Sequence, residues 1–165
     1  MHLIIVAVIL MLSAHSGVVE ETDDSPKMYE NFALRDFDGV RYELKDLIAA
    51  NKATIITFWA SWCLPCQKEL KEMNKLYTQY RKKQFAVLAV NTDQRQDVIK
   101  AKRFLLKNSI TFPSVYDERG DVKTKYQITS IPRLFLFDQK GKLIFEAKGF
   151  KDISEIENEI KKLIE

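Results

Sequence analysis

The chain has 165 residues, of which 46% are hydrophobic, and it carries 26 Lys and Arg against 23 Asp and Glu. This length suits one domain with one sizeable core rather than two domains. The two charge signs are interspersed, as in QKELKEMNKLYTQYRKKQ. Such mixing is typical of solvated helix faces and argues against a nucleic-acid-binding or membrane-surface patch.

The start of the chain has the composition of a targeting segment. An apolar run at residues 3–12 is followed by the small residues Ala14 and Ser16. The run is shorter than the ~20 residues that span a bilayer, and the small residues match the pattern that signal peptidase cleaves. We therefore expect residues 1–16 to be a secretory signal peptide. Because no Lys or Arg precedes the apolar run, an uncleaved N-terminal membrane anchor is the alternative.

This segment sets the expected division of the chain. Residues 17–26 are acidic and should form a linker, and residues 27–165 should form the folded domain. Either form of targeting places that domain outside the cytoplasm, where disulfides can form. Both histidines, His2 and His15, precede the domain, which therefore lacks the ligands of a structural zinc site and the Cys–His pair of a cysteine hydrolase. We expect no metal and no cofactor.

Turn signals and hydrophobic periodicity predict strands alternating with helices. Asp38-Gly39 is typical of a two-residue hairpin, and the runs ATIITFW and FAVLAVN are typical of strands buried on both faces. After the hairpin we expect a helix at 44–50, strand 53–59, helix 64–81, strand 85–91, a helix capped by Asp93 and reaching 108, short strand 112–117, short helix 118–126, strand 131–137, turn 138–141, strand 142–150 and a C-terminal helix. This order predicts an α/β sheet covered by helices on both faces.

The chain has two cysteines, Cys63 and Cys66, which enclose Leu64 and Pro65 where a buried strand gives way to a helix. Pro65 suits the first helical turn, so Cys63 should lie at the helix N-terminus, where unpaired amides stabilise a thiolate. Cys66 lies one turn further and inward. An accessible attacking sulfur beside a protected resolving sulfur is what thiol–disulfide exchange requires. A purely structural disulfide is the alternative, although a bridge over two residues removes little chain entropy from the unfolded state.

Glu69 follows Cys66 by one helical turn. At about 100° per residue it falls inside the arc that apolar positions such as Leu70 and Met73 occupy, whereas Lys68 lies on the opposite side. A carboxylate inside an apolar arc is unexpected for a passive surface residue. Burial would raise the pKa of Glu69 and let it exchange a proton with Cys66. The alternative is a glutamate at the edge of the arc whose side chain bends into water.

The segments FWASWCLPC and SIPRLFLF and the closing hairpin and helix resemble the thioredoxin superfamily over about residues 27–165. Within it, FALRDFDGVRYELKDL, DQKGKLIFEAKGF and the 40 residues between Asn91 and Pro132 are most similar to the extracytoplasmic TlpA/ResA-like reductases. The resemblance implies a thioredoxin fold, that is, a central mixed β-sheet flanked by helices, with an N-terminal β-hairpin extension and a central α/β insertion. It also implies thiol–disulfide oxidoreductase activity, in several relatives for cytochrome c maturation.

The resemblance also assigns residues around the Cys pair. Pro132 should be cis and face the cysteines, so that the backbone of Ile131 is offered to an extended substrate segment. Trp62, with Leu64 and Pro65, should shape the substrate-binding rim, and Trp59 should pack in the core. Classical thioredoxins place a buried aspartate where this chain has Thr57, which cannot exchange a proton, while the TlpA/ResA-like branch has a glutamate at the position of Glu69.

The leading hypothesis is therefore a reductase of protein disulfides in which Cys63 attacks, Cys66 resolves and Glu69 handles a proton. We expect a monomer that is re-reduced by an upstream membrane thiol–disulfide donor. A peroxiredoxin-type thiol peroxidase is one alternative. Those enzymes have Pro and Thr or Ser before a single peroxidatic cysteine, whereas this chain has Ala60 three residues before Cys63. A thioredoxin-fold binding module without turnover is the other. The apolar Leu64-Pro65 pair lacks the histidine of strongly oxidising relatives and favours a reductant.

Overall fold

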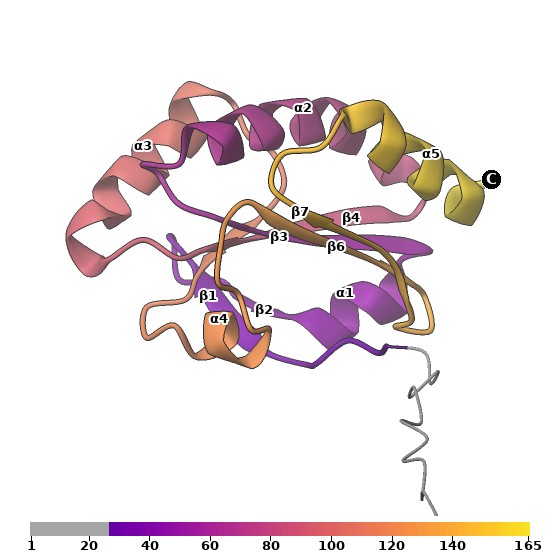
Figure 1. The fold of residues 1–165 in the computed structure, drawn as a ribbon, viewed down its shortest axis with the longest axis horizontal. Helices are drawn as coiled ribbons and strands as arrows, with labels where there is room; N and C mark the ends of the chain where they lie inside the picture. Colours follow the sequence, from indigo (N-terminus) through magenta and orange to yellow (C-terminus); the bar gives the residue numbers. More distant parts are fainter. Residues whose placement is uncertain (1–26) are drawn as a thin grey trace, which may run out of the picture.

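The computed structural model describes residues 27–165, and the expected targeting segment and linker lie outside these residues. A seven-stranded mixed sheet forms their centre, in the order β2-β1-β5-β4-β3-β6-β7 (Figure 1). Strands β3, β4 and β5 are parallel, and β6 joins β3 in the antiparallel direction. The bounds are β1 Ala33–Asp36, β2 Arg41–Glu43, β3 Ala53–Trp59, β4 Phe85–Asn91, β5 Ser114–Tyr116, β6 Arg133–Asp138 and β7 Leu143–Lys148.

Helices cover both faces of this sheet, as the sequence predicts. In Figure 1, α2, α3 and α5 lie over one face, and α1 and α4 lie against the other. The bounds are α1 Leu44–Ala50, α2 Leu64–Tyr80, α3 Val98–Lys107, α4 Asp121–Lys125 and α5 Ile153–Ile164, with 3-10 turns at Arg81–Lys83 and Arg95–Asp97. Within the described residues, no helix is both long and apolar enough to cross a bilayer.

The alternation of side chains along β3 builds the two halves of the core. Ile55 and Trp59 pack with α2 and α5 on one face, while Ile56 and Phe58 pack with residues of α1 and α4 on the other. Every residue of β3 and β4 is buried. The two apolar runs are therefore central strands covered on both sides, which confirms the prediction.

The two additions to a minimal thioredoxin fold are present. The N-terminal hairpin is β1 and β2, and it extends the sheet beyond β5. The central insertion supplies α3 and β5 between β4 and α4. The hairpin is longer than a two-residue turn, because the Asp36 amide donates to the Val40 carbonyl at 2.9 Å across a four-residue connection. Gly39 has φ +88° there, a backbone conformation that glycine adopts without strain.

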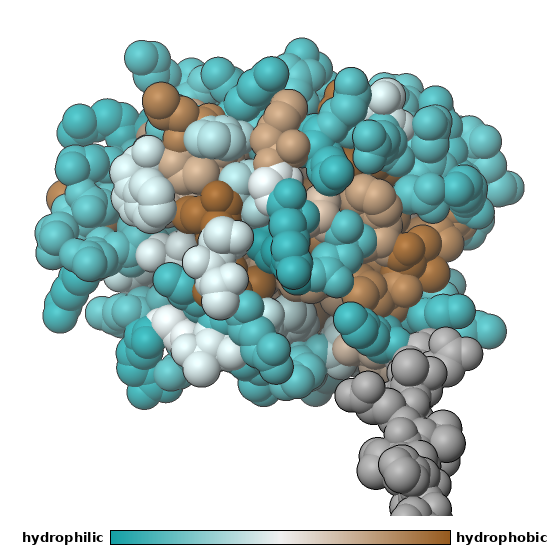
Figure 2. All heavy atoms as spheres, in the orientation of Figure 1, coloured by the Kyte–Doolittle hydropathy of each residue, from teal (hydrophilic) through white to brown (hydrophobic). Residues whose placement is uncertain are grey.

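The face of the molecule seen in Figure 2 is mostly hydrophilic, with separate apolar areas between polar side chains. Only six large apolar side chains of the described residues are strongly exposed. They are Met28, Val40, Trp62, Leu64, Ile99 and Leu106. Two of the six, Trp62 and Leu64, flank Cys63 directly in the sequence, so two exposed apolar side chains lie next to one of the cysteines.

Candidate active site

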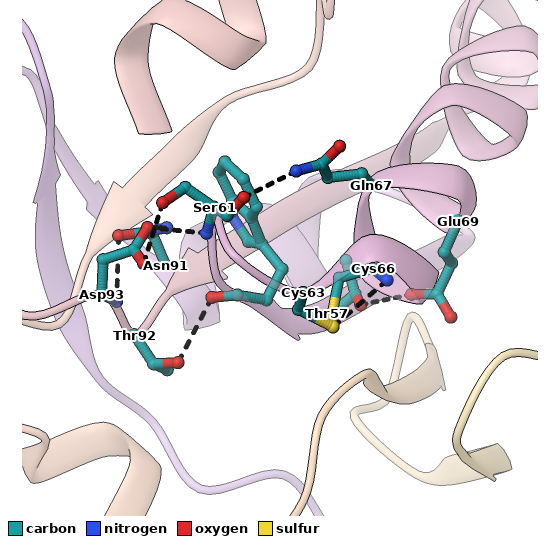
Figure 3. The surroundings of a disulfide bond; sticks show 10 residues. Thr57, Ser61, Cys63, Cys66, Gln67, Glu69, Asn91, Thr92 and Asp93 are labelled. Carbon is teal, nitrogen blue, oxygen red and sulfur yellow. Dashed lines mark hydrogen bonds between the residues drawn. A yellow bond between two sulfur atoms is a disulfide. The ribbon is translucent and has the colours of Figure 1, made fainter. Parts of the chain in front are cut away.

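Cys63 and Cys66 form a disulfide at the start of α2, with their Cα atoms 5.3 Å apart. Cys63 is the N-cap residue, and Pro65 lies in the first turn, as predicted. The backbone amide of Cys66 donates to Cys63 Sγ at 3.3 Å (Figure 3). Cys63 is 5% exposed and Cys66 is fully buried. The two sulfurs are therefore unequal: one borders the surface at a helix N-terminus and the other lies behind it.

The surface around Cys63 is apolar. Trp62 is 67% exposed and Leu64 is 74% exposed, and Pro65 between Leu64 and Cys66 is also exposed. Trp59, by contrast, is buried, and its Nε1 donates to Ser114 Oγ at 3.1 Å, so the predicted core role is confirmed. Large apolar side chains left in water beside a reactive sulfur suit contact with another protein.

Glu69 lies inside the protein. It is 1% exposed, and its Oε1 accepts a hydrogen bond from Thr57 Oγ1 at 2.6 Å (Figure 3). Its Oε2 is buried and has no hydrogen-bond partner within residues 27–165. Burial raises the pKa of Glu69 to about 7, and the hydrogen bond from Thr57 opposes part of that rise. The expected burial is confirmed, and the alternative of a side chain bent into water is wrong.

A buried carboxylate that the sequence did not reveal supports the loop before Cys63. Asp93 is 3% exposed, and its Oδ2 accepts hydrogen bonds from the Ser61 amide and from Asn91 Nδ2, both at 2.8 Å. Its Oδ1 accepts from Ser61 Oγ at 3.1 Å, and Gln67 Nε2 donates to the Ser61 carbonyl at 2.6 Å (Figure 3). The segment that leads into the Cys pair is thus fixed from both β4 and α2.

The prediction that Asp93 caps the following helix is wrong. The N-cap of α3 is Asp97, after a 3-10 turn. Asp93 turns to Ser61 because β3 and β4 are parallel and in register at Trp59 and Asn91, so the residues that follow each strand emerge side by side. A polar residue two positions after each of two adjacent parallel strands, Ser61 after β3 and Asp93 after β4, was the signal that could have suggested this contact.

The peptide bond between Ile131 and Pro132 is cis, as the resemblance implies. Pro132 is buried directly before β6, and its carbonyl accepts from the Gly149 amide at 2.9 Å. Ile131 packs against both halves of the core, and within the described residues its backbone amide and carbonyl have no hydrogen-bond partner. No group of three or more His, Cys, Asp or Glu side chains in residues 27–165 is arranged to hold a metal ion.

Comparison with known proteins agrees with this geometry. The model of the AhpC/TSA family matches residues 27–146. The thiol-disulfide oxidoreductase ResA of Bacillus cereus is 32% identical over 166 residues, covering 96% of this chain and 94% of the relative. The sporulation thiol-disulfide oxidoreductase A of Bacillus subtilis is 33% identical over 132 residues, covering 77% of this chain and 76% of the relative.

Solved structures give the same result. A thiol:disulfide interchange protein DsbE from Chlorobium tepidum superposes with a TM-score of 0.75 at 29% identity, covering 86% of this chain and 99% of that one. StoA from Bacillus subtilis superposes with a TM-score of 0.66 at 28% identity, covering 79% and 96%. Sequence, fold and the cysteine pair agree, and the chain belongs to the AhpC/TSA family and, within it, to the ResA-like thiol–disulfide oxidoreductases.

Proposed function

We propose that the protein is a reductant of protein disulfides that works outside the cytoplasm. The observation that carries the proposal is the inequality of the two sulfurs: Cys63 borders an exposed apolar surface, whereas Cys66 is enclosed with the buried carboxyl of Glu69 one turn away. An enclosed resolving cysteine reacts only after its partner has formed a mixed disulfide, so the arrangement suits a two-step exchange.

In the first step the Cys63 thiolate attacks one sulfur of a substrate disulfide. A Cys63–substrate disulfide forms, and the other substrate sulfur leaves as a thiolate that takes a proton from water. In the second step Cys66 gives its proton to the Glu69 carboxylate and attacks Cys63 Sγ. The Cys63–Cys66 disulfide forms and the second substrate thiolate leaves, so two electrons have passed to the substrate.

A group with a pKa of about 7 is half ionised near neutral pH, so Glu69 can both accept and return the proton there. Thiolate formation at Cys63 is helped by its position at the α2 N-terminus, where the Cys66 amide points at the sulfur. In the return reaction, a donor dithiol reduces the Cys63–Cys66 disulfide by the same two steps in reverse.

The substrate in this proposal is an extended protein segment. Trp62, Leu64 and Pro65 offer apolar contacts beside Cys63, and the backbone amide and carbonyl of Ile131 can pair with an extended chain. Pro132 fixes the position of that backbone. Small disulfides would use only the sulfur, so a protein substrate should react faster than a small one.

The setting of the reaction rests on the sequence and on the relatives. We infer an extracytoplasmic domain that is secreted, periplasmic or held by an N-terminal anchor, which acts as a monomer and receives electrons from a membrane thiol–disulfide donor. Reduction of disulfides in cytochrome c maturation is the specific task that the TlpA/ResA resemblance suggests. The apolar Leu64-Pro65 pair between the cysteines supports the reducing direction.

Single-cysteine variants test this function. Cys63→Ser should abolish disulfide reduction, and unchanged turnover in that variant would remove the proposed attacking role. Cys66→Ser should accumulate mixed disulfides through Cys63, whose partners mass spectrometry identifies; trapping of small thiols alone would contradict a protein substrate. The same assay is repeated with hydrogen peroxide in place of the disulfide. Faster turnover with peroxide than with disulfides would favour the thiol peroxidase alternative.

Equilibration of the reduced and oxidised protein in glutathione or dithiothreitol buffers tests the direction of electron flow. A reductant should have a midpoint near the roughly −270 mV of thioredoxin, whereas an oxidant lies near about −120 mV. A midpoint at the oxidant value would overturn the proposed direction while leaving the exchange chemistry intact.

A further inference from the structure

We propose that Thr57 is a positioning residue for Glu69, whose hydroxyl holds the carboxyl in the orientation in which it exchanges a proton with Cys66. This inference rests on the proposed role of Glu69. Thr57 does not touch substrate and carries no proton itself. It replaces the buried aspartate of classical thioredoxins, yet its hydroxyl contacts the group that takes over the aspartate's task.

In the part of the chain that the structure describes, the carboxyl of Glu69 accepts a single hydrogen bond, which comes from Thr57. Thr57 lies in β3, is fully buried, and occupies the same face of the strand as Ile55 and Trp59, against which α2 packs. Its Oγ1 stands 2.6 Å from Glu69 Oε1, while Glu69 Oε2 has no partner within residues 27–165. Without the hydroxyl, both oxygens of a buried carboxyl would lack a donor. Such a group would be free to rotate and costly to ionise.

Among the described residues, no nearby charged side chain competes with this hydrogen bond in setting the pKa of Glu69. β3 and β4, which pack against α2, carry no charged side chain. β6 and β7 also contribute to the core beside α2, and Arg133 of β6 pairs with Glu146 of β7. On α2, Lys68 is exposed and lies over the ring of Phe150. On α5, Glu157 accepts from Tyr80, near the other end of α2. Burial and the Thr57 hydroxyl are the two influences on the pKa of Glu69, and they act in opposite directions.

A pair of variants isolates the hydroxyl. Thr57→Val keeps the shape of the side chain and removes its donor, whereas Thr57→Ser keeps the donor. In the oxidised full-length protein, the carboxyl carbon of Glu69 can be followed by ¹³C NMR against pH. We expect Thr57→Val to move the midpoint upward by about one pH unit, because hydrogen bonds to charged groups are worth on the order of one pKa unit. The Thr57→Ser variant should have the same titration midpoint for Glu69 as the wild-type protein.

The same shift has a kinetic consequence. Raising the midpoint from about 7 by one unit lowers the ionised fraction at pH 7 from about one half to about one tenth, so resolution of a preformed Cys63 mixed disulfide by Cys66 should slow about fivefold. The pH profile of that step should move upward in Thr57→Val and stay in place in Thr57→Ser. A merely structural loss of packing would not produce this pattern.

The inference is overturned if Thr57→Val titrates like wild type, or if Thr57→Ser shifts the midpoint as far as Thr57→Val. Should Thr57→Val fail to fold, Thr57→Ala removes the same donor without adding bulk and is judged by the same criteria. A Glu69→Gln variant separates the proton role of Glu69 from the positioning role of Thr57. If Cys66 resolves the mixed disulfide at the wild-type rate in that variant, Glu69 has no proton role and Thr57 has no kinetic role. This holds even if Thr57→Val moves the NMR midpoint.

Discussion

Replacing Glu69 by Gln should change how the stability of the oxidised protein depends on pH. The pKa of Glu69 is raised from an ordinary value of 4.5 to about 7, with burial as the main cause. Between these values the folded chain holds a proton that the unfolded chain has lost, so stability falls as the pH rises through this window. Above it, the ionised carboxyl destabilises the folded state by about 3 kcal/mol, since one pKa unit corresponds to about 1.4 kcal/mol.

The amide that Glu69→Gln introduces would keep an acceptor for the Thr57 hydroxyl and would never ionise, so the variant escapes this loss. Urea unfolding at pH 4 and at pH 8.5 measures the effect, and the free energy of unfolding of Glu69→Gln relative to wild type should rise by about 3 kcal/mol between the two. Glu155→Gln, at an exposed position in α5, is the matched control and should show no such change. A difference between Glu69→Gln and wild type that stays constant to within ~1 kcal/mol would refute the reasoning.

Three further changes address the loop, the rim and the core. Asp93→Asn leaves fewer acceptors for Ser61, so it should lower the free energy of unfolding in urea by about 1–3 kcal/mol and slow the alkylation of reduced Cys63. If neither value changes, the hydrogen bonds from Ser61 to Asp93 are not needed to hold the loop before Cys63. Trp62→Ala should lower kcat/KM for a protein disulfide but not for a small aromatic disulfide, and equal losses on both would argue against a docking role. Met73→Ala empties a fully buried position between α2 and the sheet and should cost about 2–5 kcal/mol, measured by the same unfolding assay.

The local features of this protein can be predicted from its amino-acid sequence. The mostly apolar runs of β3 and β4 predict their bounds without error, because a strand buried on both faces consists of a nearly continuous apolar stretch. Pro65 and the 3.6-residue period of α2 place Cys63 at the helix N-terminus and turn Glu69 inward, since both features depend only on neighbours along the helix. The resemblance added the cis bond before Pro132, which a lone Ile-Pro pair does not predict.

The contacts between side chains of different helices and strands, by contrast, depend on how these elements pack in three dimensions. The parallel register of β3 and β4 brings Asp93 to Ser61, 32 residues away, and the packing of α2 on β3 brings the Thr57 hydroxyl to Glu69. The spacing of apolar residues predicts which face of a helix or strand is buried, but it does not predict which other helix or strand covers that face. For that reason the reactive pair and its glutamate could be recognised in the sequence, whereas the hydrogen bonds that hold them became visible only when the strands were placed in order.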